Sequence, residues 1–134
     1  MIWFILLIST IIRVWGINFA FPLRYGHIDE SVVIFYTVRF FSGDFNPNPF
    51  FDYPTLYLYL LFFCYLLYFA VGFIFGKFDS IGSFIAFYNT NAVPFILIGR
   101  FLTVAFSIGT IYLTYLFAKK LFDKKTGFLS ALFL

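Results

Sequence analysis

Four apolar stretches, separated by shorter polar segments, organise the chain. They cover about residues 1–21, 54–75, 93–118 and 126–134. Each of the first three is long enough for a membrane-crossing helix, which needs about 20 apolar residues. The fourth is too short, so we expect it to be the start of a further membrane helix. The chain is therefore expected to be the front part of a longer membrane protein.

The composition supports a chain for which lipid is the main solvent. Of its 134 residues, 63% are hydrophobic, 27% are aromatic and 11% are charged, and the mean hydropathy is +0.96. A soluble domain of this size could not cover so much apolar surface. We predict an all-α, polytopic protein of the cell membrane, most simply a prokaryotic plasma membrane. Nothing in the net charge of +3 indicates a nucleic-acid partner.

The first stretch resembles a signal peptide in its position only. It lacks a basic region at its start and a small-residue cleavage site, and it is long enough to span the bilayer. We interpret residues 1–21 as an uncleaved transmembrane helix and residues 93–118 as a second one.

The positions of lysine and arginine predict the orientation. Four of the nine basic residues lie in 119–125, whereas 22–53 carries two arginines and four acids. Loops rich in lysine and arginine stay in the cytoplasm, so we expect 119–125 to be a cytoplasmic loop. If every apolar stretch crossed and the N-terminus lay inside, this loop would face outside. Either the N-terminus lies outside, or one stretch does not cross.

We favour residues 54–75 as the stretch that does not cross. Pro54 suits the first turn of a helix, where its missing N–H costs nothing. The stretch also carries four tyrosines, which prefer the membrane–water interface. Residues 22–92 then form one long external loop. Because 54–75 is apolar enough to span, the other topology stays open.

Within this loop the pattern predicts a short helix over 29–43. Asp29 and Glu30 lie in its first turn, where the helix dipole favours negative charge, and Gly43 suits the end of the helix. Residues 44–53 are rich in turn formers and are not expected to be helical throughout.

The adjacent acids Asp29 and Glu30 are the strongest candidate site. Ionisable groups beside hydrocarbon are costly and tend to mark function. A carboxylate at this place can accept a proton from an attacking hydroxyl, and the pair is also a candidate ligand set for a divalent metal. The plainer interpretation is a helix cap with a first-turn acid.

Other polar residues give weaker signals. His27 is more often a hydrogen-bonding spacer than a ligand. Arg13 is expected to snorkel or to pair within a helix bundle. Arg100 is either an interfacial anchor or a contact to an anionic leaving group. The sequence contains no phosphate-binding glycine loop, zinc-ligand spacing or serine-hydrolase elbow.

An ordered series of motifs extends along the chain and carries a resemblance. The series resembles the N-terminal part of the membrane glycosyltransferases of GT-C fold, closest to the protein O-mannosyltransferase and aminoarabinose-transferase family (glycosyltransferase family 39-like). It covers essentially all 134 residues. Its members are Arg13-Val14-Trp15-Gly16, His27-x-Asp29-Glu30, Phe41-Ser42-Gly43-Asp44, Asn46-Pro47, Phe51-Asp52-Tyr53-Pro54-Thr55-Leu56-Tyr57, Gly99-Arg100-Phe101-Leu102 and Thr126-Gly127.

The resemblance implies a function and roles for individual residues. Such enzymes transfer a sugar from a polyprenyl-phosphate carrier to a protein, lipid or glycan acceptor on the external face. Asp29 matches the presumed catalytic acid, and Glu30 would support it or a metal. The family's two juxtamembrane helices match 29–43 and 54–75, so the resemblance implies a partial GT-C module.

The resemblance also exposes a departure. Bacterial aminoarabinose transferases tend to carry a lysine before the proline of the second loop helix, where this chain has Tyr53. The carrier phosphate would then be bound by Arg100 or by residues beyond 134, with His27 and Tyr53 as further candidate substrate contacts. Complete members are several times longer, so 134 residues are not expected to be active alone.

A second hypothesis makes the chain a non-catalytic membrane subunit or a transporter fragment. In that case Asp29 and Glu30 would form a cation site or an assembly contact.

Overall fold

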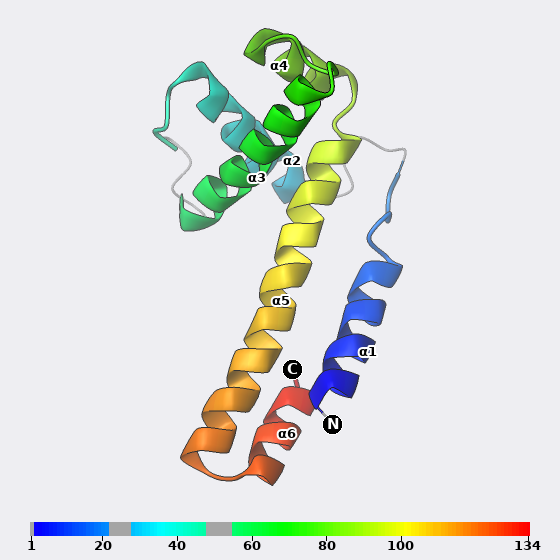
Figure 1. Ribbon diagram of the computed structural model, residues 1–134, viewed down its shortest axis with the longest axis vertical. Helices are drawn as coiled ribbons and strands as arrows, with labels where there is room; N and C mark the ends of the chain where they lie inside the picture. Colours follow the sequence, from blue (N-terminus) through cyan, green and yellow to red (C-terminus); the bar gives the residue numbers. More distant parts are fainter. Residues whose placement is uncertain (1, 22–27, 48–54) are drawn as a thin grey trace. The chain divides into compact units, whose positions relative to one another are not determined.

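The computed structural model describes residues 2–21, 28–47 and 55–134 (Figure 1). These residues form helices and contain no strand, which confirms the all-α prediction for the described ranges. The helices are α1 (Ile2–Trp15), α2 (Ile28–Arg39), a 3₁₀ turn η1 (Phe40–Ser42), α3 (Thr55–Ile74), α4 (Ile81–Thr90), α5 (Val93–Leu121) and α6 (Lys124–Leu132).

The chain divides into two compact units. We call Met1–Asn18 with Arg100–Leu134 the terminal unit, and Phe19–Gly99 the central unit. The terminal unit holds α1, most of α5 and α6. The central unit holds α2, η1, α3, α4 and the first two turns of α5.

In the terminal unit, α1 is shorter than the apolar pattern predicts. The helix ends at Trp15, and residues 16–21 form turns rather than the last third of a helix over 1–21. Gly16 disfavours helix, and Pro22 restricts the residue before it to extended conformations. A left-handed backbone at Ala20, with φ of 71°, also belongs to this turn.

Most of the segment 119–125, predicted as a cytoplasmic loop, is helical in the structure. α5 continues to Leu121 and α6 begins at Lys124, so the connection is Phe122 and Asp123. Lysine is a good helix former, and cations suit the last turn of a helix, so Lys119 and Lys120 extend α5 instead of ending it. Asp123 caps α6 by accepting a hydrogen bond from the Thr126 backbone N–H at 2.7 Å.

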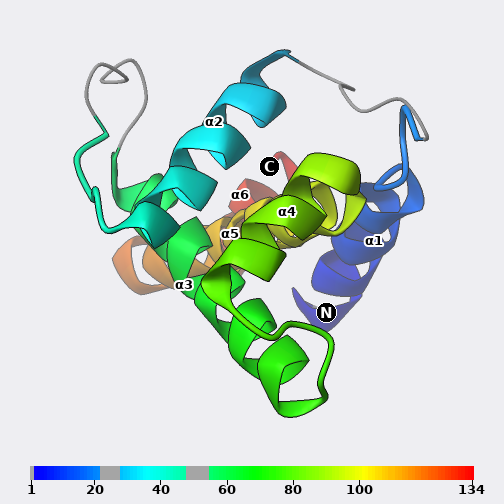
Figure 2. The same cartoon turned by 90° about the horizontal axis from the view of Figure 1, so that it is seen from above.

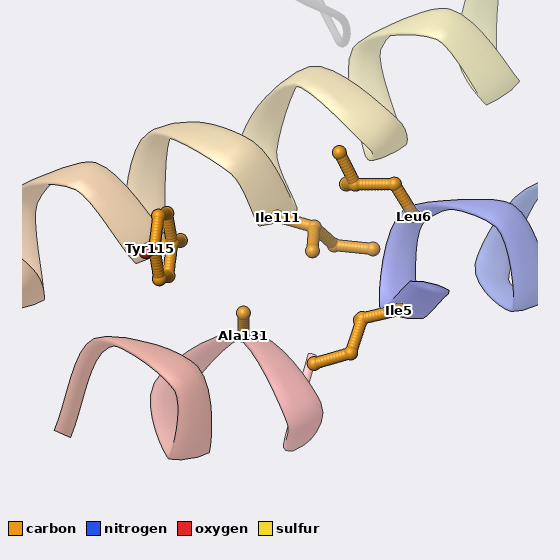
Figure 3. Packing of buried hydrophobic residues seen from close by; sticks show 5 residues of the cluster. All are labelled: Ile5, Leu6, Ile111, Tyr115 and Ala131. Atoms are coloured by element: carbon orange, nitrogen blue, oxygen red, sulfur yellow. The ribbon is translucent and has the colours of Figure 1, made fainter. Parts of the chain in front are cut away.

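The three helices of the terminal unit meet in a small, mainly aliphatic cluster (Figure 3). The approach of α6 depends on Gly127, since a Cβ there would lie 2.9 Å from the Tyr115 carbonyl oxygen. The cluster therefore forms where a small residue lets two helix backbones come close. Its buried members are Ile5, Leu6, Ile111, Tyr115 and Ala131.

In the central unit, the helix predicted over 29–43 is present as α2 and η1. Gly43 ends it in the left-handed conformation, with φ of 88°, and its N–H donates to the Phe40 carbonyl. Glycine adopts this conformation without the steric cost of a Cβ. Figures 1 and 2 show α2 beside α3, where Phe40 and Leu58 are buried together.

Helix α4 was not predicted. Ser80 begins it with a reciprocal capping box, in which Ser80 and Ser83 side chains each bond the other's backbone N–H. A capping box with serine in place of glutamate or glutamine at its third position is easily overlooked. Glycines at 76 and 82 further obscured the helix in the sequence.

Two helices are long and apolar enough to cross a membrane, namely α3 and α5. The most apolar window of α3 is 22% buried and that of α5 is 17% buried, whereas the core helix of a soluble protein is mostly buried. α1 is apolar but has 14 residues, about 21 Å at 1.5 Å per residue.

Candidate functional site

Asp29 and Glu30 occupy the first turn of α2, as predicted. The Asp29 side chain is exposed and that of Glu30 is half-buried. Neighbouring residues on a helix point about 100° apart, because 3.6 residues complete a turn. The two carboxylates therefore have different surroundings, and Asp29 is the one that an incoming molecule reaches.

The body of α2 is fixed, which sets the position of its acidic end. Phe40 and Leu58 are 1% and 0% exposed, and partly buried side chains of α2 and α3 surround them: Val32, Val33, Tyr36 and Phe62. Thr37 is fully buried, and its hydroxyl donates to the Val33 carbonyl at 2.8 Å. These contacts fix the backbone of α2, from which the Asp29 and Glu30 side chains project.

The other end of this segment has its own charge pair. The Arg39 guanidinium forms an ion pair with Asp44, and Asp44 also accepts a hydrogen bond from the Asn46 backbone N–H at 3.1 Å. Both side chains are about 40% exposed, so the pair adds little stability. Its role is to close the turn that follows η1, apart from the acids at the start of α2.

Arg100 is the first residue of α5 that belongs to the terminal unit. Its guanidinium donates to the Ile17 carbonyl at 2.6 Å, and its side chain is half-buried. Arg100 therefore ties α5 to the turn after α1. Because the acids belong to the central unit, a site shared by Arg100 and Asp29 stays a prediction. His27 and Tyr53 lie outside the described residues.

Arg13 pairs within the helix bundle of the terminal unit, which was one of the two expectations for it. Its Nε donates to the Ser107 hydroxyl at 2.6 Å, linking α1 to α5, and its Nη1 donates to the Ser9 carbonyl at 3.4 Å. Ser107 lies seven residues after Arg100, two helical turns along α5. Two arginines thus connect α1 and its turn to one face of α5.

The described ranges bring no third metal-ligating side chain to Asp29 and Glu30. They contain no group of three or more His, Cys, Asp or Glu side chains that could hold an ion together. Asp29 and Glu30 alone offer two carboxylates that diverge, whereas a divalent cation takes six or more oxygen ligands. The divalent metal remains a prediction from the sequence, and no chemical step below depends on it.

Tyrosine hydroxyls of α3 hold contacts that the sequence did not reveal. Tyr65 donates to the Phe95 carbonyl at 3.0 Å and Tyr57 to the Gly99 carbonyl at 3.1 Å. Both acceptors lie in the first turns of α5. From the sequence, the tyrosines of 54–75 are predicted to be interface residues. The signal for their contacts with α5 was the spacing of eight residues between Tyr57 and Tyr65, which places both on one face of the helix.

Lys77, beyond the end of α3, is held by aromatic rings. Its ammonium group donates to the Tyr68 hydroxyl at 2.8 Å and lies 4.6 Å from the centre of the Phe87 ring. Such cation–π contacts stabilise a charged side chain on an aromatic surface. Lys77 therefore fixes the turn between α3 and α4 rather than joining a charged site.

Comparison with known proteins found no matching protein-family model, no similar curated protein and no similar solved structure.

Proposed function

We propose that this chain is the N-terminal part of a membrane glycosyltransferase that takes a sugar from a polyprenyl-phosphate carrier on the external face. The observation that carries the proposal is the exposed carboxylate of Asp29 at the first turn of an otherwise anchored helix. The ordered motifs that resemble the GT-C family support the same assignment.

In the proposed reaction, Asp29 is the catalytic base. Its carboxylate accepts the proton of an acceptor hydroxyl while that oxygen attacks the anomeric carbon of the sugar. The bond between this carbon and the carrier phosphate oxygen breaks, and polyprenyl phosphate leaves as an anion. One displacement inverts the anomeric carbon. Glu30 supports Asp29 from its less exposed position.

The proposal includes α5 as a membrane crossing with its lysine-rich end in the cytoplasm. Residues 101–118, between Arg100 and Lys119, contain no charged side chain. These 18 residues measure about 27 Å as a helix, close to the hydrocarbon thickness of about 30 Å. Arg100 then marks the external boundary and Lys119 the cytoplasmic one.

Contacts within the central unit support an α3 that stays on the external side. Phe41, before α3, and Phe84, after it, lie with their ring centres 4.9 Å apart. Phe41 also lies 5.0 Å from Phe62, near the middle of α3. A crossing helix would separate its two flanks by about 30 Å of hydrocarbon. The contact between these two flanks therefore favours an arrangement in which both ends of α3 lie on the same side of the membrane.

The contacts of α3 with α5 agree with this placement. Tyr65 and Tyr57 bond to carbonyls of residues 95 and 99, which precede Arg100 and so lie outside the proposed hydrocarbon span. The outward face of α3 is apolar and would contact lipid in this placement; α3 has no charged residue and is also apolar enough to cross the membrane. Its exposed side chains include Leu56, Leu60, Phe63, Leu67, Val71 and Ile74.

The test of the catalytic role is Asp29→Asn in the complete gene product, assayed for transfer from a lipid-linked sugar. We expect the turnover to fall about 10²–10⁴-fold, because general-base catalysis contributes that much. Asp79→Asn is the matched control, since Asp79 is also exposed and lies in the turn before α4. Undiminished transfer by Asp29→Asn would remove this residue from the mechanism.

A further inference from the structure

Four lysines gather where α5 ends and α6 begins. Lys119 and Lys120 lie in the last turn of α5, and Lys124 and Lys125 open α6. All four side chains are exposed. The two helices are held close here by Gly127, whose Cα approaches the backbone of Lys119. The hairpin therefore keeps its lysines in one small region.

The one acid within this hairpin offsets only one of the four lysine charges. Asp123 accepts hydrogen bonds from the backbone and side chain of Thr126, which hold its pKa below the ordinary value. Among the described residues of the terminal unit, Asp123 is the only carboxylate side chain. The hairpin thus presents a net positive surface whose single carboxylate serves as a helix cap.

An open hollow of about 470 Å³ adjoins these lysines. Its lining residues are Leu116, Lys119 and Lys120, which are one turn apart or adjacent on α5. The lining combines the Leu116 side chain with the long side chains of two lysines, and the Lys119 ammonium group lies 5.8 Å from the centre of the Tyr115 ring. Exposed apolar side chains lie on both sides along the chain, at Phe117 and Phe122. The hollow therefore places the lysine side chains next to exposed apolar side chains of the same helix.

We propose that this hollow binds an anionic phospholipid of the cytoplasmic leaflet. The lipid phosphate binds the ammonium groups of Lys119 and Lys120, which leave α5 in different directions and reach the phosphate on long, flexible side chains. An acyl chain follows Leu116 toward the bilayer centre. Basic residues directly beside a membrane helix attract anionic lipids in this way. The proposal rests on the crossing of α5 that the proposed function includes, and it is independent of Asp29.

The test uses the purified chain in a neutral detergent, with lipid binding followed by native mass spectrometry. Phosphatidylglycerol is the anionic probe and phosphatidylcholine the neutral one. We expect retained phosphatidylglycerol, and binding about fivefold weaker for Lys119→Gln and for Lys120→Gln. Lys77→Gln removes the same charge from the central unit and is expected to bind as the unaltered chain does.

Three results would overturn the proposal. They are equal retention of the two lipids, equal weakening by Lys77→Gln and Lys120→Gln, and displacement of the lipid by millimolar inorganic phosphate. The last result would identify a site for free phosphate. The Asp29→Asn variant should retain the lipid fully, so that failure of the catalytic proposal and failure of the lipid site give different results.

Discussion

The two units of the chain are built from different kinds of contact. The central unit has an aromatic core, with Tyr65, Phe84 and Phe95 completely buried. The terminal unit has a small cluster that is mainly aliphatic, with Tyr115 as its buried aromatic member, and polar links between helices such as the hydrogen bond from Arg13 to Ser107. A ring-filled core stabilises a unit in water, whereas close helix packing with polar links is typical of helices in lipid.

Charge follows the same division. Among the described residues, the central unit carries four of the acids, and the terminal unit carries Asp123 alone together with four lysines in one hairpin. The acids of the central unit are Asp29, Glu30, Asp44 and Asp79. Lysine-rich segments stay in the cytoplasm, so this distribution of charge agrees with the proposal that the lysine-rich end of α5 is cytoplasmic and the acids of the central unit are external.

The largest expected effect is on the aromatic core. The Phe84 ring lies 4.9 Å from Phe41, 5.0 Å from Phe78 and 5.1 Å from Phe95. Phe84→Ala should cost about 3–5 kcal/mol of stability in the central unit, because it leaves a cavity among these rings. Hydrogen exchange measured on peptides of each unit should show faster exchange in α3 and α4 and unchanged exchange in α6.

Phe63→Ala is the matched control, because Phe63 is 58% exposed on α3. It should leave hydrogen exchange nearly unchanged and weaken the attachment of the central unit to vesicles. Equal exchange effects of the two substitutions would contradict the distinction between a packed face and a lipid-facing face of α3.

A smaller effect is expected in the terminal unit. Gly127→Ala places a Cβ 2.9 Å from the Tyr115 carbonyl oxygen and the Lys119 Cβ, so α6 must move away from α5. We expect a cost of about 1–3 kcal/mol, as for other overpacked sites. Exchange should rise in α6 while the central unit stays protected, the reverse of Phe84→Ala.

Gly109→Ala supplies the comparison within the same unit. A Cβ at Gly109 meets nothing within 4 Å, and alanine favours helix over glycine by about 1 kcal/mol. This substitution should raise the thermal stability in detergent slightly. A loss as large as that of Gly127→Ala would show that the close approach at Gly127 is not what holds α6.

The smallest effect is a pH dependence at the α6 cap. Hydrogen bonds from Thr126 lower the pKa of Asp123, so the folded pKa lies below the unfolded one. The capping stabilisation is then fully present above the ordinary aspartate pKa and is lost as pH falls through the lowered folded pKa. Carboxyl NMR should place the midpoint below the ordinary value. Asp123→Asn should remove the pH dependence, and a midpoint at or above the ordinary value would contradict the cap.

Sequence patterns predicted the elements whose ends carry strong chemical signals. The helix over 29–43 has acids at its start and a glycine at its end, and both act as expected. Hydrophobicity alone overestimated the length of α1, because it ignored the helix-ending signals of Gly16 and Pro22. The apolar run continues past Trp15, although the helix stops there. The lysine-rich pattern of 119–125 predicted a loop, whereas its lysines lie in the last turn of α5 and the first turn of α6.

The candidate site was predictable only in part, for a physical reason. The place of Asp29 depends on local helix chemistry, which the sequence contains. The anchoring of α2 depends on contacts with Leu58 and Phe62, 18 or more residues beyond Phe40 along the chain, and no local pattern encodes such contacts. No local pattern encodes the tyrosine contacts between α3 and α5 either. These contacts support the proposed position of the membrane boundary along α5.

The most direct test of this account is a pair of single-cysteine variants on either side of α3. Asn46→Cys and Asp79→Cys, each in a Cys64→Ser background, are labelled in intact cells with a reagent that does not cross the membrane. We predict that both positions are labelled from outside, while Lys124→Cys is labelled only after the membrane is opened. Labelling of positions 46 and 79 from opposite sides would mean that α3 crosses the bilayer, and it would contradict an external central unit.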